Sequence, residues 1–546
     1  MALHTFCWHG RPLVPLAFAF LSGCLGPDAA AEAQPIDASP TFWAAPHGSG
    51  SGRSADDPFQ VHDFFASLEK STHCGGTLVL RDGTYRGPRS TIEPPAGLSG
   101  CPGSPIVVRA EHEGRVFVSG EDGDGGDPER APIAFSRNDW WVLEGFDAKE
   151  SNAHVARIAN GSDHVTLRRM VLGGARTRDN GNFKVLEITW GGQHVPSNDA
   201  HVEDVAVLGP GRYLVNVFRS DRATLRRVFA YYTDYPARVR GGISLYHSDD
   251  SLVENAIVTM DPASQARGVI GIFVHANKRG ETANHNRFIG NLVYGMSGTS
   301  FELTSRTEQI LGNRVIDTAL LRGRGLGFLQ DADSELFVRR LTVADHLGSG
   351  FKAALRPQLS TAKARRAGFE LGLDLEQSLF VRTDRGLLVR KESLPGESCC
   401  KVGRIHVAGN GYFHLRRGAL GGDAEFGPGD RCGGAKQAHC RATPPALPLE
   451  RYGRVGGYLF GTTIDDRSVG ARVIERSEDG ERTSSCLWPW PMEERIAAAA
   501  PGLIGHELSV TWAARGGVWA TLEDVCNSAG SRSGRGNRIA ADATRG

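Results

Sequence analysis

Five short segments decide the fold of this chain: VLEITW (185–190), LVNVFR (214–219), ISLYH (243–247), IFVHA (272–276) and FELTS (301–305). Each alternates apolar and polar residues, which is typical of a β-strand with one buried face. Related segments, IAF, ARIA and GFLQD, extend the series on both sides. One inward apolar residue aligns in every segment, at intervals of 23 to 30 positions: Phe135, Ile158, Ile188, Val217, Leu245, Val274, Leu303 and Phe328.

A second strand series lies between the members of the first and includes VTLRRMVL (165–172) and ATLRRVFA (223–230). Two interleaved series with one period predict a chain that winds once per period, each turn pairing in parallel with the last about 4.8 Å away. Asn255, Asn291 and Asn313 are expected at bends, because asparagine tolerates left-handed backbone. Leucine-rich repeats would show closely spaced leucines, and propeller blades would need about 40 residues. We therefore predict an all-β fold, a right-handed single-stranded parallel β-helix.

The composition agrees with a folded chain that has many turns. Of its 546 residues, 69 are glycine and 27 are proline, which disfavours a protein built from long helices. The 62 basic and 62 acidic side chains cancel. A nucleic-acid partner is therefore not expected, because such proteins usually carry a basic excess.

The N-terminal segment predicts export. Its apolar stretch at 12–21 is shorter than the roughly 20 residues that span a bilayer, so residues 1–24 are interpreted as a cleaved signal. The sequence LSGC that ends at Cys24 resembles the bacterial lipobox, in which the cysteine is lipidated; ordinary cleavage after Ala33 is the alternative. We expect a lipid-anchored protein at the outer membrane, on its periplasmic or cell-surface side, with a flexible tether at 25–41.

The cysteines predict disulfides, as is usual in an exported chain. Cys74 and Cys101 form the expected local pair. A zinc site is disfavoured, because no Cys-x-x-Cys pair or closely spaced pair of histidines accompanies them. Apart from Cys7 and Cys24, the remaining cysteines all lie in the last third of the chain: Cys399, Cys400, Cys432, Cys440, Cys486 and Cys526.

Both ends of the coil are expected to be capped. Val61–Leu68 places apolar residues at i, i+3, i+4 and i+7, which predicts one buried helical face. This helix would cover the first turn of a β-helix that spans 42–415. The strand pattern fails beyond that range, and 416–546 is expected to form a cysteine-containing C-terminal cap or tail.

Four motifs carry a resemblance to a known group: FWAAPHGSG (42–50), DPF (57–59), RDGTY (81–85) and SPI (104–106). Together they resemble the opening of secreted pectate-lyase-like β-helix proteins. CLWPWPMEE (486–494) is similar to a tail motif on some bacterial β-helix proteins. The resemblance implies the fold better than the activity, because that superfamily includes polysaccharide lyases, glycoside hydrolases, phage tailspikes and proteins without known chemistry.

The predicted coil brings one varied surface together, because outward side chains of successive turns lie about 5 Å apart. Acids, bases, imidazoles and aromatic rings share this surface, which indicates binding or reactivity rather than a plain solvated wall. Just before the aligned positions stand Glu187, Asn216, Ser244, Phe273 and Glu302, and just after them stand Thr189, Phe218, Tyr246, His275 and Thr304. The strand ends and turns add Trp190, Arg219, His247, Lys278 and Arg306.

An acidic polysaccharide is the substrate class that this surface fits. β-Elimination needs a positive group to neutralise the uronate carboxylate and a base to remove the C5 proton. We expect Lys278 as the base and Arg306 as the stabiliser, with His275 or His247 as alternates for either role. Calcium is a candidate cofactor, held by Glu187 and Glu302. The resemblance implies a similar set, since lyases of this fold usually combine a Lys or Arg base with calcium carboxylates.

Sugar contacts are expected from residues on and beside the same surface. Tyrosines offer platforms for sugar rings, and arginines pair with uronate carboxylates. The loop at 229–240 is rich in both. The expected substrate-binding residues are Trp190, Arg219, Tyr235, Arg240, Tyr246 and His247.

Other functions stay open at this point. In a non-catalytic glycan-binding or structural surface protein, the same residues would be salt-bridged surface groups. A glycoside hydrolase needs paired carboxylates, and Asp249 with Asp250 is the one adjacent pair on this surface. Only this Asp-Asp matches the polygalacturonase-type motifs, so hydrolysis ranks below elimination. We expect a monomer whose partners are a polysaccharide and, through its lipid, a membrane.

Overall fold

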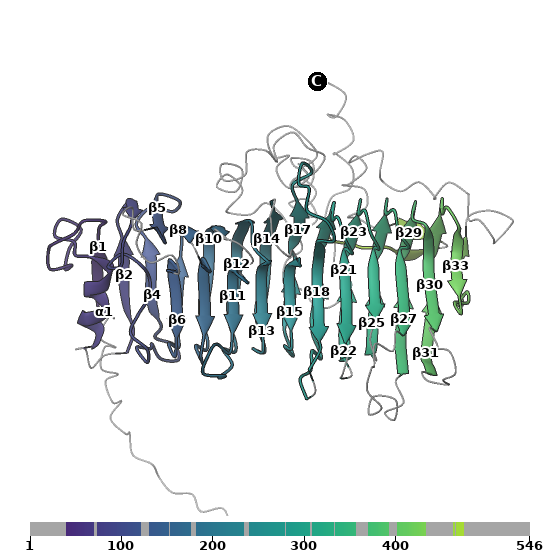
Figure 1. The fold of residues 1–546 in the computed structure, drawn as a ribbon, viewed down its shortest axis with the longest axis horizontal. Coiled ribbons are helices and arrows are strands. Elements are labelled where there is room, and N and C mark those ends of the chain that lie inside the picture. The colour runs from purple at the N-terminus through teal and green to yellow at the C-terminus, as the bar shows by residue number, and fades with distance from the viewer. Residues whose placement is uncertain are drawn as a thin grey trace, which may run out of the picture. The chain divides into compact units, whose positions relative to one another are not determined.

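The computed structural model describes residues 40–69, 74–121, 130–151, 153–175, 182–233, 240–278, 280–305, 308, 310–331, 334–355, 370–391, 401–432, 462–464 and 466–473. Almost all strands among them pair in parallel with strands one turn earlier and one turn later, and they follow one another in sequence order along the stack (Figure 1). The chain is therefore a parallel β-helix, as predicted. The predicted signal, its lipidation site Cys24 and most of the C-terminal cap lie outside the described residues.

One side of the coil is a sheet of eleven parallel strands. It contains the strand series from which the fold was predicted. In stacking order the strands are β6 (Ile133–Ser136), β9 (Ala156–Ala159), β11 (Lys184–Thr189), β13 (Tyr213–Phe218), β15 (Gly241–Tyr246), β18 (Ile270–Ala276), β21 (Phe301–Ser305), β24 (Phe328–Asp331), β27 (Phe351–Leu355), β30 (Arg385–Lys391) and β33 (Gly418–Gly422).

The other two sides belong to one larger sheet that turns a corner. Face 1 precedes the corner and comprises β1 (Thr41–Ala44), β2 (Gly76–Leu80), β4 (Ile106–Ala110), β7 (Trp141–Glu144), β16 (Leu252–Glu254), β19 (Arg287–Ile289), β22 (Ile310–Ile316), β25 (Ser334–Arg339), β28 (Glu370–Glu376) and β31 (Lys401–Ala408). Face 2 follows the corner and comprises β3 (Gly83–Tyr85), β5 (Val116–Ser119), β8 (Asp147–Ser151), β17 (Ile257–Met260), β20 (Leu292–Tyr294), β23 (Ala319–Leu321), β26 (Thr342–Ala344), β29 (Leu379–Val381), β32 (Gly411–Phe413) and β34 (Arg431–Cys432). Three longer strands run through both faces: β10 (Thr166–Ala175), β12 (His201–Gly209) and β14 (Thr224–Tyr232). A separate antiparallel pair joins β35 (Thr462–Ile464) to β36 (Arg467–Val469).

A left-handed residue forms the corner between the two faces. Its φ lies between 47° and 80° in successive turns, at Gly145, Arg169, Asp204, Arg227, Asn255, Gly290, Asp317, Arg340, Gln377 and Gly409. The second predicted series therefore holds two strands per turn, and the coil has three sides rather than two. The sequence concealed this corner, because β10, β12 and β14 keep apolar residues on both sides of it.

The three asparagines that were expected at bends have different outcomes. Asn255 is left-handed, with φ of 51°. The prediction was wrong for Asn313, which lies within β22 after the left-handed Gly312. Asn291 does lie at the bend between β19 and β20, but Gly290 before it takes the left-handed conformation instead of this asparagine. The buried side chains of Asn291 and Asn313 accept hydrogen bonds from backbone N–H groups of an adjacent turn.

The predicted column of apolar residues is confirmed over most of its length. Ile188, Val217, Leu245 and Val274 pair in register on successive strands, and each is fully buried. Leu303 follows them in the same file, but Phe328 does not, because Leu303 pairs with Gln330 instead. The alignment was therefore two positions off in that turn.

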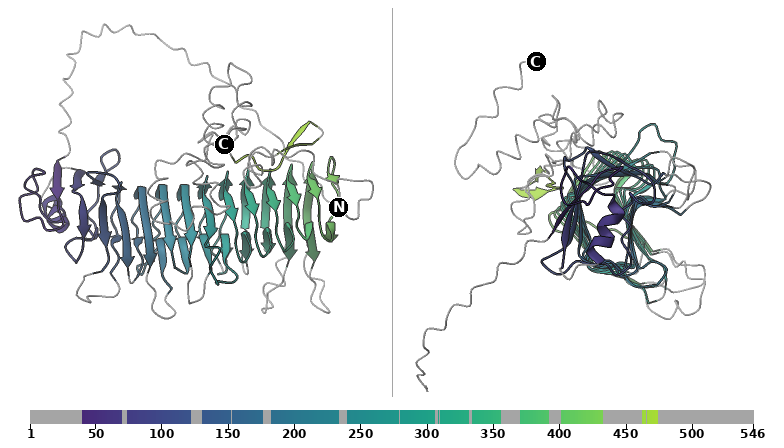
Figure 2. Two further views of the ribbon diagram at one scale, coloured as in Figure 1. Left: turned by 90° about the horizontal axis from the view of Figure 1, so that it is seen from above. Right: turned by 90° about the vertical axis from the view of Figure 1, so that its left-hand side faces the viewer.

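The predicted N-terminal cap is also confirmed. Helix α1 (Val61–Glu69) buries Val61, Phe64, Phe65 and Leu68, the four residues that its periodicity placed on one face. Viewed along the stack, α1 lies within the outline of the coil at its N-terminal end (Figure 2). Cys74 and Cys101 form the predicted disulfide, with Cα atoms 5.8 Å apart. Among the described residues, no helix has the length and apolar content needed to cross a membrane.

A ladder of polar side chains joins equivalent positions in successive turns of the coil and fixes their register. Each oxygen accepts a hydrogen bond from the backbone N–H of the equivalent residue in the next turn, over 2.6 to 2.9 Å. This arrangement satisfies backbone groups that burial would otherwise leave without partners. The ladder runs through Asp139, Asp163, Asn198, Asp221, Asp249 and Asn284.

The buried imidazole of His346 predicts an acid-sensitive component of stability. Burial lowers the pKa of His346 to about 4, whereas an unfolded chain has a value of about 6.5. The unfolded state therefore binds the proton first, and stability falls as the pH drops from about 6.5 towards 4, by about 3 kcal/mol in total. Above that window both states are neutral and the contribution vanishes.

This component can be measured by difference. Urea unfolding of the wild type and of His346→Gln, at neutral pH and near pH 4, should show a smaller acid-induced loss in the variant. An equal loss in both proteins would show that His346 does not produce it.

Candidate functional site

A hollow of about 190 Å³ lies on the outer surface of the eleven-stranded sheet. Four residues that the sequence predicted line it: Arg240, Tyr246, His275 and Glu302. They come from the turn before β15 and from the outward positions of β15, β18 and β21, so the stacking of turns assembles the site. The other lining residues are Arg212, Tyr213, Phe273, Asn277, Thr304, Ser305 and Asp331.

A row of rings leads into this hollow. Phe218, Tyr246 and His275 pair in register on β13, β15 and β18, with ring centroids 5.1 Å and 4.8 Å apart. Nδ1 of His275 lies 2.7 Å from Oγ1 of Thr304, which fixes the imidazole against the next strand. Burial raises the pKa of Tyr246, so its phenol keeps its proton at neutral pH. The row offers flat rings, an imidazole and a proton donor over three successive turns.

Two arginines lie in adjacent turns at one side of the hollow. Arg212 precedes β13 and Arg240 precedes β15, and the backbone N–H of Arg240 donates to the carbonyl of Arg212 over 3.0 Å. Nη1 of Arg212 donates to Oδ1 of Asn182 over 2.7 Å. Arg240 is exposed and has no hydrogen bond or ion pair through its side chain to another described residue. The sequence predicted Arg240 and missed Arg212, although both stand at the same place before their strands.

The two glutamates predicted as a calcium site do not fit one ion. Register separates Glu187 from Glu302 by four turns, which is about 19 Å at the spacing of paired strands. Calcium ligands lie within about 2.6 Å of the ion. Glu187 is also engaged, because its Oε1 lies 2.8 Å from Nζ of Lys184. Burial opposes its ionisation, but attraction from His154 and Lys184 outweighs this and keeps the pKa of Glu187 below its ordinary value.

Trp190, Arg219 and His247 form a separate cluster in the turns beyond the sheet, outside the hollow. The guanidinium of Arg219 lies 3.6 Å from the centre of the Trp190 ring, and its Nε is 2.9 Å from Oε2 of Glu281. Nε2 of His247 lies 3.1 Å from the same carboxylate. Burial lowers the pKa of His247 despite that neighbour. The charge of Arg219 is thus balanced within the protein, which does not favour its predicted role as a uronate contact.

Of the remaining predicted residues, only Lys278 belongs to the described part of the chain, and it is not brought into the hollow. Lys278 is exposed in the turn after β18 and does not line it. Arg306 and Tyr235 lie outside the described residues. The geometry thus leaves His275, rather than Lys278, as the predicted base that the hollow contains.

Asp249 and Asp250, the adjacent carboxylates considered for hydrolysis, have different structural roles. Oδ1 of Asp249 accepts from the backbone N–H of Asn284, and its Oδ2 accepts from the hydroxyl of Thr282, both over 2.6 Å. Asp250 is an exposed left-handed residue in the turn before β16, with φ of 56°. Asp249 is therefore a structural ladder residue, which removes the pair as a hydrolytic site.

Comparison with known proteins finds no matching family model and no matching curated protein. Among solved structures, the chain is similar to the pectate lyase Pel9A, with 15% identity, a TM-score of 0.39, and coverage of 65% of this chain and 78% of that one. It is similar to a mannuronic-acid-specific family 6 polysaccharide lyase from human gut microbiota, with 14% identity, a TM-score of 0.42, and coverage of 79% and 96%. It is also similar to PfbA, a surface adhesin of Streptococcus pneumoniae, with 9% identity, a TM-score of 0.38, and coverage of 62% and 90%. The β-helix of this chain is established by its strand registers.

Proposed function

We propose that the hollow on the eleven-stranded sheet binds an acidic polysaccharide and cleaves it by β-elimination. One observation carries the proposal: Arg212 and Arg240, on adjacent turns, share a hollow with the imidazole of His275 and the phenol of Tyr246. Arginine pairs well with carboxylates, and tyrosine and histidine rings offer platforms for sugar rings. The hollow therefore combines groups that hold a uronate with groups that move protons.

The chemistry assigns each group one task. The arginines neutralise the uronate carboxylate, which makes the C5 proton more acidic. His275 takes that proton, the C–H electron pair forms the C4–C5 double bond, and the bond from C4 to the glycosidic oxygen breaks. Tyr246, kept protonated by burial, gives its proton to the leaving oxygen. No step depends on a metal ion.

Calcium, export and lipid anchoring belong to the same proposal as separate expectations. A calcium ion at the hollow would use Glu302 and Asp331, which both line it, rather than Glu187. Export and lipidation at Cys24 would place the protein at the outer membrane, in contact with extracellular or periplasmic glycans. Mass spectrometry of the protein from membranes would detect an acylated Cys24.

Arg240→Gln tests the proposed substrate contact. Removal of one guanidinium from a carboxylate site is expected to weaken oligogalacturonate or oligomannuronate binding roughly tenfold, since hydrogen bonds to charged groups contribute about 1.5–3 kcal/mol. Calorimetry measures the binding, and the ultraviolet absorbance of the new double bond measures the turnover. Arg137→Gln, an exposed arginine next to β6 outside the hollow, is the matched control.

Three results separate the outcomes. Loss of binding and turnover in Arg240→Gln but not in Arg137→Gln supports the proposal. Binding without any new double bond on pectate, alginate or glycosaminoglycans would favour the non-catalytic glycan-binding alternative. Equal behaviour of both variants would remove this hollow as the substrate site.

A further inference from the structure

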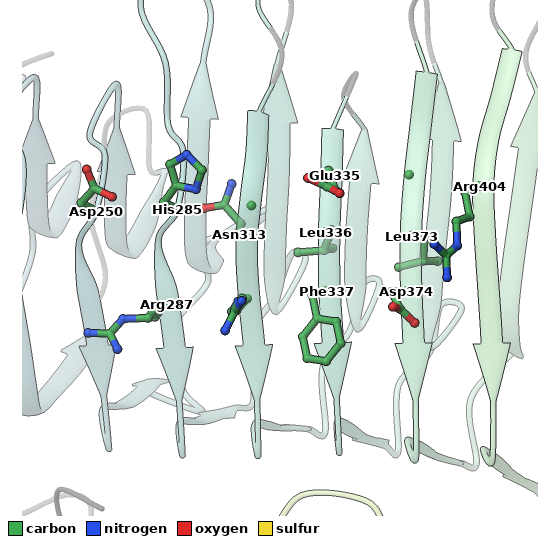
Figure 3. A pocket seen from close by; sticks show the side chains of 13 residues that line it. Asp250, His285, Arg287, Asn313, Glu335, Leu336, Phe337, Leu373, Asp374 and Arg404 are labelled. Atoms are coloured by element: carbon green, nitrogen blue, oxygen red, sulfur yellow. The ribbon is translucent and has the colours of Figure 1, made fainter. Parts of the chain in front are cut away.

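A larger hollow, of about 730 Å³, lies on face 1 and contains none of the residues predicted for the lyase site. Its residues come from β19, β22, β25, β28 and β31 and from the turns before β16 and β19, and Figure 3 shows their side chains spread over successive strands. The register changes twice among these strands. It shifts between β22 and β25 in the segment from Ile310 to Asn313, and between β28 and β31 in the segment from Leu371 to Leu373. Such β-bulges add a residue and redirect side chains, and they are frequent beside functional sites.

The same face has balanced charges before it reaches this hollow. Glu203, Arg226 and Glu254 stand in one register row on β12, β14 and β16. Nε of Arg226 lies 2.9 Å from Oε2 of Glu254, and its Nη1 lies 3.6 Å from Oε1 of Glu203. Charges of opposite sign therefore alternate from turn to turn and stabilise each other.

Another register row of face 1, two positions earlier on each strand, lacks this alternation inside the hollow. Arg287 on β19 and Arg314 on β22 are directly paired in register, and both are exposed. Within the part of the chain that the structure describes, neither side chain has a hydrogen bond or an ion pair. Like charges directly opposite each other destabilise a sheet. Two adjacent, uncompensated arginines in a concave surface therefore point to an external anion.

The next strands add groups that suit a sugar. Phe337 on β25 follows Arg314 in the same register row and is half-buried, so one ring face can meet an apolar sugar face. Asp374 on β28 follows Phe337, and its Oδ1 lies 2.7 Å from Nδ1 of His406. Figure 3 shows Arg287, Phe337 and Asp374 at similar heights on their strands.

The carboxylates of the hollow narrow the class of ligand. Asp250, Glu335 and Asp374 line it together with the arginines. Closely spaced phosphates of a nucleic acid would be repelled by these acids, whereas sugar hydroxyls can donate hydrogen bonds to them. A glycan that carries both hydroxyls and anionic groups can satisfy the acids and the arginines together.

We propose that this hollow, which we name the face-1 groove, is a second binding site for an acidic oligosaccharide, separate from the hollow on the eleven-stranded sheet. Arg287 and Arg314 bind the carboxylate or sulfate groups, Phe337 supports a sugar ring, and Glu335 and Asp374 accept hydrogen bonds from hydroxyls. The groove does not depend on the elimination chemistry. It would bind an oligosaccharide whether or not the hollow on the eleven-stranded sheet cleaves that oligosaccharide.

The test uses the full-length protein with both arginines replaced, Arg287→Gln with Arg314→Gln. Arg109→Gln is the matched control, because Arg109 is an exposed residue of β4 on the same face outside the groove. The probes are a tetragalacturonate, a sulfated heparin tetrasaccharide and a neutral cello-oligosaccharide, measured by calorimetry. All proteins also carry His275→Gln, so that cleavage does not consume the probes.

We expect the double variant to bind at least one acidic probe roughly tenfold or more weakly, while Arg109→Gln and the neutral probe show no such change. The carboxylated and sulfated probes identify which anion the groove prefers. The melting temperature of the double variant should be unchanged or higher than that of the parent protein, since the substitutions remove a like-charge contact. Unchanged affinity for both acidic probes in the double variant, or no binding of either probe by the His275→Gln protein, overturns the proposal. Turnover of the Arg240→Gln protein is measured separately, so failure of the face-1 groove and failure of the lyase proposal give different results.

Discussion

Replacing Asp317 by asparagine is expected to lower the free energy of unfolding by about 3–5 kcal/mol, because it removes the carboxylate that pairs with the buried charge of Arg340. Arg340 donates to both carboxylate oxygens of Asp317, over 2.8 Å and 2.7 Å. Their side chains are 3% and 0% exposed. Asparagine tolerates the left-handed backbone of this corner, so the substitution changes the charge with little backbone strain.

The chain supplies a matched control for that experiment. Asp199 and Arg222 form the same two-bond pair, also one turn apart and left-handed, but their side chains are 28% and 51% exposed. Solvent screens such a pair, so Asp199→Asn should cost less than about 1 kcal/mol. Urea unfolding of both variants measures the difference. Equal losses would show that burial does not set the contribution of these left-handed pairs.

Replacing His275 by glutamine is expected to reduce the rate of elimination by about 10²–10⁴-fold, the usual contribution of a general base. Glutamine keeps a polar side chain beside Thr304, so folding and substrate binding should change little. The turnover number should therefore fall while KM stays within a few-fold. Initial rates of formation of the unsaturated product, over a range of substrate concentrations, give the turnover number and KM separately.

A histidine elsewhere on the coil controls for loss of an imidazole as such. His201 lies on β12 in the larger sheet, 3.2 Å from Oε2 of Glu203, and outside the hollow. His201→Gln should leave turnover near that of the wild type. If His275→Gln retains full turnover, His275 is not the base, and the exposed Lys278 becomes the next residue to replace.

The sequence predicted the site less completely than the fold. It placed Tyr246, His275 and Glu302 on one surface, because the period of the strands specifies which outward residues stack, and it added Arg240 from the tyrosine- and arginine-rich loop beside them. It could not show that Glu187 is neutralised by Lys184, since strict alternation would place these two side chains on opposite faces of the strand. It also missed the face-1 groove, whose lining strands contain two register shifts that no hydrophobic period records.

By itself, the sequence determined the coil, its apolar column, the helical cap at α1 and the pairing of Cys74 with Cys101. These features depend on local alternation and spacing, which remain readable along a single chain. Only the tertiary structure decided which charges are compensated, because many of the ion pairs, such as Arg226 with Glu203 and Glu254, join residues from different turns. The contrast between Arg226, paired on both sides, and Arg287, which faces another arginine, follows from register alone. A bulge of one residue is enough to change such neighbours, and with them the surface on which this protein can bind an anion.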